Sequence, residues 1–580
     1  SEKTALEIAE KSDENTAFQI RRYISLSDAW CFWIDRIVEI ACGGKSAREY
    51  THEFVRSPHV PRGNRMENFL YNLGRDVTSD DAKILASLAL ADLADYITAV
   101  FDPDFRLISY AEHLGTSEAS FSNVIEGLKS PVLTEFYDAL LEEELEIPKQ
   151  VRNDTNAEPF DKAQGSVRND TKAELFLVSV PFPGCFEAAV YTAQKIRKMY
   201  DKNAIIALGG GFCNTELRNI SETRLFDYFD LISYDMGYGS YLHLLDKMKA
   251  GNAFDGKPIY KIKYMYDGKI IGDCDTRSPA GTGTQVANDT PAGTGTPVGG
   301  VDYAALEEEI CRRLVPDYAQ VDFSKDRRLA DDTNPMHRIW NDGSWLKAYL
   351  AHGCYWHRCA FCDTTLEYVN RFHKCNARSL CDGLKTQAEK TGVWGIHFVD
   401  EACPPSALVE FGLENCRGKN STGGISGVPK KLTFWGNIRF EKTFTRDMAN
   451  FLSYAGLTAV SAGIEIATGD GLEAVNKGTT IENIVKACCA FKEAGILVHS
   501  YMIFGYYNQS EQDLINSMET LRQFFKNGLL DSAFWHKFTL TLHSTVYKEW
   551  QEGKHPKLKP IVNQPNYSSK AEKTEVRFAF

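Results

Sequence analysis

Six strand-like segments between residues 345 and 545 alternate with turns and helices, and this alternation is the strongest constraint on the fold. The segments are 345–351, 393–399, 432–438, 457–464, 496–504 and 533–542. A strand that returns through a helix to the next strand predicts a parallel sheet. Six such units within about 200 residues predict a partial (β/α)6 barrel, whose chemistry lies at the carboxyl ends of its strands. Between the fourth and fifth segments, Thr479 and Glu482 predict a capping box before a helix through Phe491.

The composition is that of a large globular protein. Of the 580 residues, 43% are hydrophobic and 25% are charged, which excludes intrinsic disorder, collagen and a small disulfide scaffold. The longest apolar stretch, 84–100, contains Asp92 and Asp95 and is shorter than the ~18 residues that a membrane-spanning helix needs. An odd count of 15 cysteines and the absence of a signal-peptide pattern favour a cytoplasmic location. The net charge of −13 argues against general nucleic-acid binding.

Two short duplications divide the chain. VRNDT occurs at 151–155 and 167–171, and PAGTGT occurs at 279–284 and 291–296. Such segments bury too little apolar surface to offset the entropy of ordering, so we interpret both as inserted surface loops. The predicted parts are a helical N-terminal region (1–150), an insert (151–172), an α/β domain (173–275), a second insert (276–300), a connector (301–344), the barrel (345–545) and a C-terminal tail (546–580).

The segment 173–275 shows an α/β pattern of its own. Strands are predicted at 175–182, 204–208 and 230–234, with a helix at 187–200 and a run of glycines at 209–211. Glycine-rich turns at the carboxyl ends of parallel strands let a flat ligand approach the backbone closely. This pattern predicts a flavodoxin-like, Rossmann-type domain. Because about five strands complete such a domain and only three are evident, we expect upstream sequence to be missing.

Three cysteines, Cys354, Cys359 and Cys362, follow the first barrel segment in the run GCYWHRCAFC. Three thiolates within nine residues can converge on one soft metal centre. A structural zinc site has four protein ligands, whereas an iron–sulfur cluster held by three cysteines keeps one iron open to a cofactor or substrate. A zinc knuckle completed by Cys375 is the alternative that these residues leave open.

The cysteine run resembles the radical S-adenosylmethionine superfamily. This resemblance implies that Cys354, Cys359 and Cys362 hold a 4Fe-4S cluster whose open iron chelates the amino and carboxylate groups of S-adenosylmethionine. The aromatic Phe361 before the last cysteine also fits the superfamily pattern. Four residues separate the first two cysteines, which is similar to several cobalamin-binding members.

Further matches occur at the ends of the next four barrel segments. The resemblance implies that the cofactor's ammonium, carboxylate, ribose and adenine meet residues from these ends in turn. The implied S-adenosylmethionine residues are Asp400 and Glu401 after the second segment, Asn437 and Arg439 after the third, Glu465 after the fourth, and Phe504 and Gly505 after the fifth. Aromatic, acidic and histidine residues near the strand ends are candidates to line the substrate pocket, namely Asp342, Trp345, Tyr355, Trp535, His536 and His543.

The α/β segment resembles the cobalamin-binding domain that precedes the barrel in a large subgroup of the superfamily. The implied cobalamin residues are Ser179, Val180, Gly209, Gly210, Gly211, Asn214, Asp235 and Gly237. The sequence has no Asp-x-His-x-x-Gly pattern, so cobalamin is expected to bind without the histidine that this motif supplies.

The resemblance implies a radical enzyme that transfers a methyl group from methylcobalamin to an unactivated carbon. Rearrangement or oxidation without methyl transfer is the alternative within the same chemistry. The expected partners are a small-molecule or peptide substrate and an electron donor such as flavodoxin or ferredoxin. We expect no association with a membrane.

Overall fold

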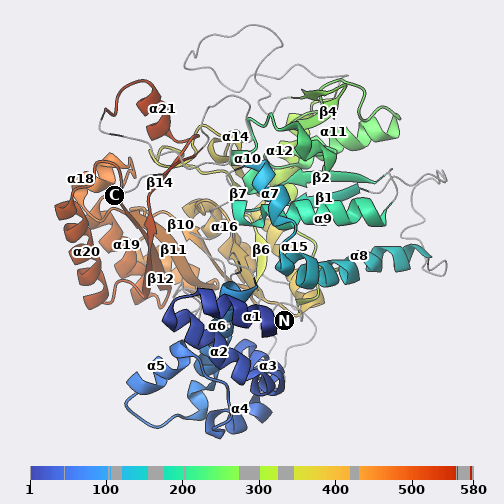
Figure 1. Cartoon of the computed structure of the whole chain (residues 1–580). Helices are drawn as coiled ribbons and strands as arrows, with labels where there is room; N and C mark the ends of the chain where they lie inside the picture. The colour runs from blue at the N-terminus through green and yellow to red at the C-terminus, as the bar shows by residue number, and fades with distance from the viewer. Residues whose placement is uncertain are drawn as a thin grey trace. The chain divides into compact units, whose positions relative to one another are not determined.

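The computed structural model describes residues 2–44, 46–101, 105, 120–153, 175–200, 204–272, 301–323, 345–417, 430–556, 558 and 575–577 (Figure 1). Of the two predicted inserts, only residues 151–153 are described. The part of the connector from 324 to 344 also lies outside the described residues. The chain forms two compact units. One consists of Ser1–His113, Glu126–Glu158 and Asp322–Ser344, and the other of Leu114–Ile125, Pro159–Val321 and Trp345–Phe580. None of the described helices is long and apolar enough to cross a membrane.

The first unit is helical, which confirms the helical N-terminal region. Its helices are α1 (Glu2–Lys11), α2 (Glu14–Ser25), α3 (Ser27–Cys42), α4 (Ala47–Arg56), α5 (Asn64–Asn72), α6 (Ala82–Val100) and α8 (Asp138–Asn153), and α7 (Phe121–Gly127) spans the boundary between the units. Apolar faces of α3 and α6 meet in a core that includes Trp33, Ile37, Leu85 and Ala86. A stripe of apolar residues at helical spacing buries its surface by such pairwise packing.

A five-stranded sheet forms the α/β domain of the second unit. Strands β1 (Leu175–Ser179), β2 (Ile205–Gly209) and β3 (Leu231–Ser233) are parallel, with helices α9 (Phe186–Met199), α10 (Gly211–Thr215) and α11 (Tyr238–Lys249) in the connections. These elements confirm the Rossmann-type α/β class. The sequence did not predict two further strands, β4 (Ile262–Tyr266) and β5 (Lys269–Ile271). Strand β4 pairs antiparallel with β3, and β5 pairs antiparallel with β4.

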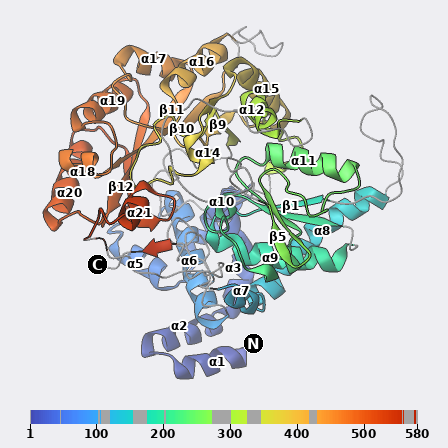
Figure 2. The same ribbon diagram turned by 90° about the horizontal axis from the view of Figure 1, so that it is seen from above.

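Six parallel strands form the second sheet, in the order of the chain. They are β6 (Leu346–Ala348), β9 (Gly395–Phe398), β10 (Thr433–Ile438), β11 (Leu457–Glu465), β12 (Leu497–Phe504) and β13 (Ser532–Lys537). The helices that return between them are α15 (Ala377–Thr391), α16 (Pro405–Cys416), α17 (Arg446–Tyr454), α18 (Gly469–Ala474), α19 (Ile481–Glu493) and α20 (Glu511–Lys526), and Figure 2 shows α16, α17 and α19 along the outer side of the sheet. The predicted partial (β/α)6 barrel is thereby confirmed.

Short elements fix the loops at the carboxyl end of this sheet. Strands β7 (Ala351–His352) and β8 (His373–Lys374) pair antiparallel around the cysteine run and helix α14 (Glu367–Asn370). Strands β14 (Thr539–Thr541) and β15 (Glu575–Arg577) pair after the sixth barrel strand, and α21 (Thr545–Gln551) follows β14. Helix α12 (Tyr303–Arg313) lies in the predicted connector. Among the described residues, β7, β8 and α14 thus lie in the connection that carries the cysteine run.

Candidate functional site

The three predicted cysteines line one cavity of about 390 Å³, which we call the cysteine cavity. The loop begins at Gly353, whose φ of 73° and close approach to the carbonyl of Arg371 leave no space for a side chain. The amide of Cys354 donates to the Val369 carbonyl at 2.8 Å. The loop is thus anchored to the end of α14 immediately before its first thiol.

Backbone contacts hold the middle of the cysteine loop against distant segments. The amide of Ala360 donates to the Val475 carbonyl at 3.0 Å, and the Ala360 carbonyl accepts from the amide of Val546 at the same distance. The side-chain amide of Asn476 donates to the carbonyl of Arg358 at 2.9 Å. Residues after β11 and after β14 therefore set the position of the thiols.

Two cations lie beside the buried thiol of Cys359. The guanidinium of Arg439 donates to its sulfur at 3.7 Å, and the ammonium of Lys477 pairs with Glu465 at 2.7 Å within the same cavity lining. A hydrogen bond with the Cys362 thiol, followed by the charges of Lys477 and Arg439, lowers the pKa of Cys359 to about 6 against the opposing effect of burial. Within this pair a thiolate, the form in which cysteine binds metals, is favoured at Cys359, whereas the hydrogen bond with Cys359 and burial raise the pKa of Cys362.

Most residues that the resemblance implies for S-adenosylmethionine reach this cavity. Phe361, Glu401, Asn437, Arg439 and Glu465 all line it, together with the three cysteines. The strand ends β9, β10 and β11 supply four of these side chains, as expected for the carboxyl end of a parallel barrel. A cavity with carboxylates, an amide and a guanidinium can pair with both the ammonium and the carboxylate of an amino acid.

Asp400 is a correction to the predicted set. Its carboxylate is fully buried and accepts the amides of Leu350 at 2.9 Å and Ala351 at 2.7 Å, so it joins the ends of β9 and β6 and does not line the cavity. Burial raises the pKa of Asp400 to about 7, although these hydrogen bonds oppose the shift. The alternation of side chains along β9 directs Glu401, and not Asp400, to the cavity.

Phe504 and Gly505 are a second correction, since neither residue lines the cysteine cavity. The carbonyl of Phe504 accepts from the amide of Phe538, and the amide of Gly505 donates to the side chain of Gln509 at 2.8 Å. Tyr501, three residues earlier on β12, reaches the cavity in their place.

The zinc-knuckle alternative is not formed by the described residues. The Cys375 thiol donates to the carbonyl of Cys311 at 3.1 Å and is absent from the cavity lining. No three histidine, cysteine, aspartate or glutamate side chains among the described residues are close enough to hold a single metal ion. Three thiols spread over one cavity wall instead suit a cluster in which each cysteine binds its own iron.

The glycine turn of the α/β domain packs against its own chain. Gly210 has a φ of 102°, and a Cβ there would lie 2.5 Å from the carbonyl oxygen of Val180. A Cβ on Gly211 would lie 2.7 Å from the Pro181 carbonyl oxygen. The close approach that glycine permits at this turn is therefore between the ends of β1 and β2.

Asn214 and Asp235 are also engaged within the domain. The Asn214 side-chain oxygen accepts the amide of Asp235 at 2.7 Å, and the Asp235 carboxylate pairs with Arg218 at 2.9 Å and Lys261 at 3.0 Å. All four side chains are buried. Of the residues implied for cobalamin, namely Ser179, Val180, Gly209, Gly210, Gly211, Asn214, Asp235 and Gly237, only Gly211 lines a described cavity.

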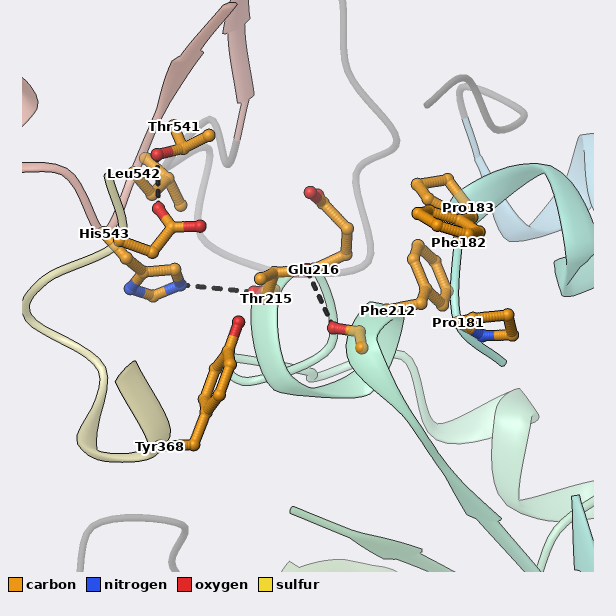
Figure 3. Close-up of a pocket in the computed structure, with 12 residues that line it drawn as sticks. Pro181, Phe182, Pro183, Phe212, Thr215, Glu216, Tyr368, Thr541, Leu542 and His543 are labelled. Carbon is orange, nitrogen blue, oxygen red and sulfur yellow. Dashed lines mark hydrogen bonds between the residues drawn. The ribbon is translucent and has the colours of Figure 1, made fainter. Parts of the chain in front are cut away.

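A second cavity of about 270 Å³, the junction cavity, lies between the α/β domain and the barrel (Figure 3). Its lining residues are Pro181, Phe182, Pro183, Gly211, Phe212, Thr215, Glu216, Asp363, Tyr368, Thr541, Leu542 and His543. Pockets for drug-sized ligands have about 300–1,000 Å³, and a corrinoid is larger than such ligands. Described without a ligand, this cavity is smaller than the space that a corrinoid occupies.

Asp363 and Tyr368 line both cavities, which the sequence did not predict. Of the candidate substrate-pocket residues that the structure describes, only His543 lines one of the two cavities, the junction cavity. Tyr355 instead donates to Glu441 at 3.2 Å, and Asp342 lies outside the described residues. An aspartate directly after the third cysteine was the available signal for Asp363.

No protein-family model and no curated protein matches this chain. Solved structures of radical enzymes do match it. The radical S-adenosylmethionine methyltransferase TsrM from Kitasatospora setae, with cobalamin and a 4Fe-4S cluster bound, is 16% identical over 66% of this chain and 65% of its own, with a TM-score of 0.48. The cobalamin-dependent S-adenosylmethionine radical enzyme OxsB, with aqua-cobalamin and S-adenosylmethionine bound, is 14% identical over 70% of this chain and 56% of its own, with a TM-score of 0.47. In these two matches this chain covers less than two thirds of the length of the solved chain.

Proposed function

We propose that this chain is a radical S-adenosylmethionine enzyme in which Cys354, Cys359 and Cys362 hold a 4Fe-4S cluster. The observation that carries the proposal is that three thiols of one nine-residue run line a single cavity. Ionisable and amide groups from three successive strand ends line the same cavity. A cluster held by three cysteines keeps one iron for a further ligand, and these groups suit the amino acid part of S-adenosylmethionine.

The cavity residues have separate tasks in this proposal. Glu401 accepts the cofactor's ammonium, Arg439 pairs with its carboxylate, and Glu465 accepts from a ribose hydroxyl. Lys477 holds the Glu465 carboxylate through the 2.7 Å ion pair. When held by Cys354, Cys359 and Cys362, the cluster would supply the electron for reductive cleavage of S-adenosylmethionine and hence radical chemistry at an unactivated carbon of the substrate.

The loop contacts serve to exclude water from this chemistry. Trp356 lies under the Arg439 guanidinium, 4.5 Å from its ring centroid, and donates to the Asn476 carbonyl at 3.0 Å. The side chain of Cys359 is almost completely buried. Water and oxygen would quench a carbon radical, and the burial of the Cys359 side chain limits their access at this thiol.

Anaerobic reconstitution with iron and sulfide tests the proposal. The wild type is expected to be brown, to contain iron and acid-labile sulfide, and to cleave S-adenosylmethionine when dithionite is added. Cys359→Ala is expected to lose cleavage by at least 100-fold. Cys375→Ala is the matched control, because that thiol is buried on another side of the loop and is expected to keep both cluster and cleavage. Undiminished cleavage by Cys359→Ala would overturn the assignment.

Cobalamin-dependent methyl transfer is the second candidate function. The observation that favours it is the junction cavity, where the ends of β1 and β2 face the cysteine loop. It requires the segments around Phe182 and Phe212 to separate from the barrel, because the described cavity is too small for a corrinoid. Visible absorbance of a corrinoid that stays bound through anaerobic gel filtration tests this candidate. We further propose flavodoxin or ferredoxin as the electron donor and the cytoplasm as the location.

A further inference from the structure

A cluster of charged side chains joins the α/β domain to the segment that follows the cysteines. It consists of three cations and three carboxylates, namely Arg218, Lys261, Arg371, Asp235, Glu307 and Glu367. The first part of the cluster belongs to the α/β domain, Glu307 to α12, and Glu367 and Arg371 to α14 and the residue that follows it. The charges of the six side chains balance, so each ion depends on the others.

Lys261 pairs with a carboxylate from each of these three segments. Its ammonium lies 3.0 Å from Asp235, 3.2 Å from Glu307 and 3.5 Å from Glu367. Only 3% of the Lys261 side chain is exposed. Burial opposes the charge, but the carboxylates raise the pKa of Lys261, so the side chain is protonated at neutral pH. A buried ammonium of this kind is stable only while its carboxylates stay in place.

The backbone of Lys261 has an uncommon conformation. Its φ of 50° lies in the left-handed region, which a lysine rarely adopts. Its carbonyl accepts the amide of Tyr234 at 3.0 Å, directly after β3. Such strain persists only where the surrounding contacts fix the residue. The chain therefore maintains a strained residue at the point where its side chain reaches α14.

Helix α14 connects this lysine to the first thiol. Glu367 is the first residue of the helix, and the carbonyl of Val369 accepts the amide of Cys354 at 2.8 Å. A Cβ on Gly353 would collide with the carbonyl oxygen of Arg371, so the end of α14 packs directly on the start of the cysteine loop. One ion pair and one hydrogen bond thus lead from the buried ammonium to the loop that carries the thiols.

Helix α12 makes a second connection beside the first. The Glu307 carboxylate accepts the amide of Gly239 in the α/β domain at 3.2 Å. Glu308, the next residue, lies 3.6 Å from Arg371 and 3.4 Å from His373. The α/β domain and the segment after the cysteines are therefore fixed to the same helix as well as to each other.

We infer that Lys261 is a positioning residue, whose buried ammonium couples the end of β3 to α14 and thereby fixes the cysteine loop. With a neutral side chain in its place, Asp235, Glu307 and Glu367 would repel one another. Helix α14 has only four residues, too few to form a stable helix alone, so it is the segment expected to shift. The effect on S-adenosylmethionine rests on the proposed function, whereas the effect on the loop is a property of the chain alone.

Hydrogen exchange of the full chain without a cluster tests the inference in Lys261→Met, which keeps the length of the side chain and removes its charge. The amides in 353–371 are expected to exchange roughly tenfold faster than in the wild type. Lys263→Met is the matched control, because the Lys263 ammonium donates to the Arg218 carbonyl within the α/β domain. It is expected to leave exchange in 353–371 unchanged. Wild-type exchange there in Lys261→Met, or equal acceleration by both variants, would overturn the inference.

Glu367→Gln tests the same link from the opposite side and stays informative if Lys261→Met does not fold. Because coupling is reciprocal, the amides in 259–264 are expected to exchange roughly threefold faster. Glu410→Gln is the control, since it removes a 2.6 Å pair with Lys374 of β8 that lies at the surface, and it is expected to leave 259–264 unchanged. Unchanged exchange of 259–264 in Glu367→Gln would contradict the coupling.

The double variant of Lys261→Met and Glu367→Gln separates a direct link from two independent losses of stability. If the lysine acts through this glutamate, the acceleration in 353–371 is smaller than the product of the two single effects. An acceleration equal to that product would show that the two residues act separately, which contradicts the inference.

Binding of S-adenosylmethionine is measured on the reconstituted proteins by anaerobic calorimetry, together with their iron content. Lys261→Met is expected to keep the wild-type iron content and to raise the dissociation constant roughly fivefold, whereas Lys263→Met keeps both. An unchanged dissociation constant in Lys261→Met would contradict the positioning role. A wild type that forms no cluster contradicts the proposed function, whatever the exchange shows. A wild type that holds the cluster, with unchanged exchange in Lys261→Met, contradicts only this inference.

Discussion

The cysteine loop and the glycine turn lie at the same kind of place, the carboxyl ends of parallel strands, yet they use their side chains differently. Around the cysteine loop, three thiols, Glu401, Asn437 and Arg439 line one cavity. Around the glycine turn, the side chains of Asn214 and Asp235 form a hydrogen bond and ion pairs with other residues of the same domain. Position in the fold therefore indicates where a ligand can bind, and the direction of the side chains decides whether one does.

This difference separates two kinds of mutational effect. Substitutions near the glycine turn are expected to lower the stability of the α/β domain, because their partners are other residues of the chain. Substitutions in the cysteine cavity are expected to change ligand binding as well as stability, because Asn437, Arg439 and Glu465 line the cavity and also pair with other residues of the chain. Variants at Asp235, Gly210, Arg439 and Asp400 test this difference between the two regions.

The largest stability effect is expected at Asp235. Asp235→Ala leaves Arg218 without its 2.9 Å carboxylate partner and removes one of the anions around Lys261. Removing one partner of a buried ion pair costs about 3–5 kcal/mol. Hydrogen exchange of the amides in β1 and β2 is expected to accelerate accordingly. Unchanged exchange, with loss of corrinoid binding instead, would place Asp235 in a ligand site.

Gly210 is expected to show the next largest effect. Gly210→Ala combines a φ of 102° with a contact at 2.5 Å from the Val180 carbonyl, so we expect a loss of about 2–4 kcal/mol in the same exchange measurement. Gly251→Ala is the matched control, because Gly251 has a φ of 72° and no atom within 4 Å of the added Cβ. There the strain of the backbone alone is expected to cost about 1 kcal/mol. Equal losses at both glycines would contradict the packing role of Gly210.

The sequence predicted the barrel because six strand-like segments alternate with helices and turns over residues 345–545, and the structure has its six parallel strands in these segments. It missed the hairpin of β4 and β5, although the signal was present. Asp267 and Gly268 both have positive φ values, as a two-residue hairpin turn requires, and Asp-Gly is a preferred pair for that turn.

Two predictions, the helix cap at Thr479 and the cavity residue Asp400, each differ by one position from what the structure shows. The helix α19 is capped by the Thr480 hydroxyl, which accepts the amide of Asn483, and not by the predicted Thr479, whose hydroxyl donates to the carbonyl of Phe440. Asp400 and Glu401 likewise differ only in the side of the strand end to which they point. Neither choice can be made from spacing, because neighbouring residues carry the same chemistry and only the packing distinguishes them.

On the barrel side, Arg439→Met is expected to weaken ligand binding, and it also removes the 3.1 Å ion pair with Glu441. The guanidinium would lose its contact with the Cys359 sulfur and with the cofactor's carboxylate, while the methionine fills similar volume. The dissociation constant of S-adenosylmethionine is expected to rise about 10- to 100-fold, equivalent to about 1.4–2.8 kcal/mol, in anaerobic calorimetry. Arg446→Met, which removes an exposed pair with Glu493, is the control and is expected to leave binding unchanged. An equal effect of both variants would indicate a non-specific charge effect.

Asp400 belongs to the barrel, but like the residues of the glycine turn its side chain contacts other residues of the chain. Its substitution is expected to have the smallest effect on the free energy of unfolding. Its pKa of about 7 in the folded state lies above the ordinary value of 3.8, so between about pH 4 and pH 7 the folded chain holds a proton that the unfolded chain has released. The free energy of unfolding therefore falls as the pH rises through this window. The full shift corresponds to about 4 kcal/mol, and we expect about 1–2 kcal/mol because relaxation and water entry reduce the cost of burial.

Asp400→Asn removes this titration, so its free energy of unfolding in urea is expected to be flatter from pH 4 to pH 7 than that of the wild type. Asp382→Asn, at an exposed site, is expected to keep the wild-type slope. Parallel slopes for the wild type and Asp400→Asn would mean that the carboxylate is ionised throughout this range. The amides of Leu350 and Ala351 would then be sufficient to stabilise a buried charge at the end of β9, and Asp400 would be available as an anion beside the cysteine cavity.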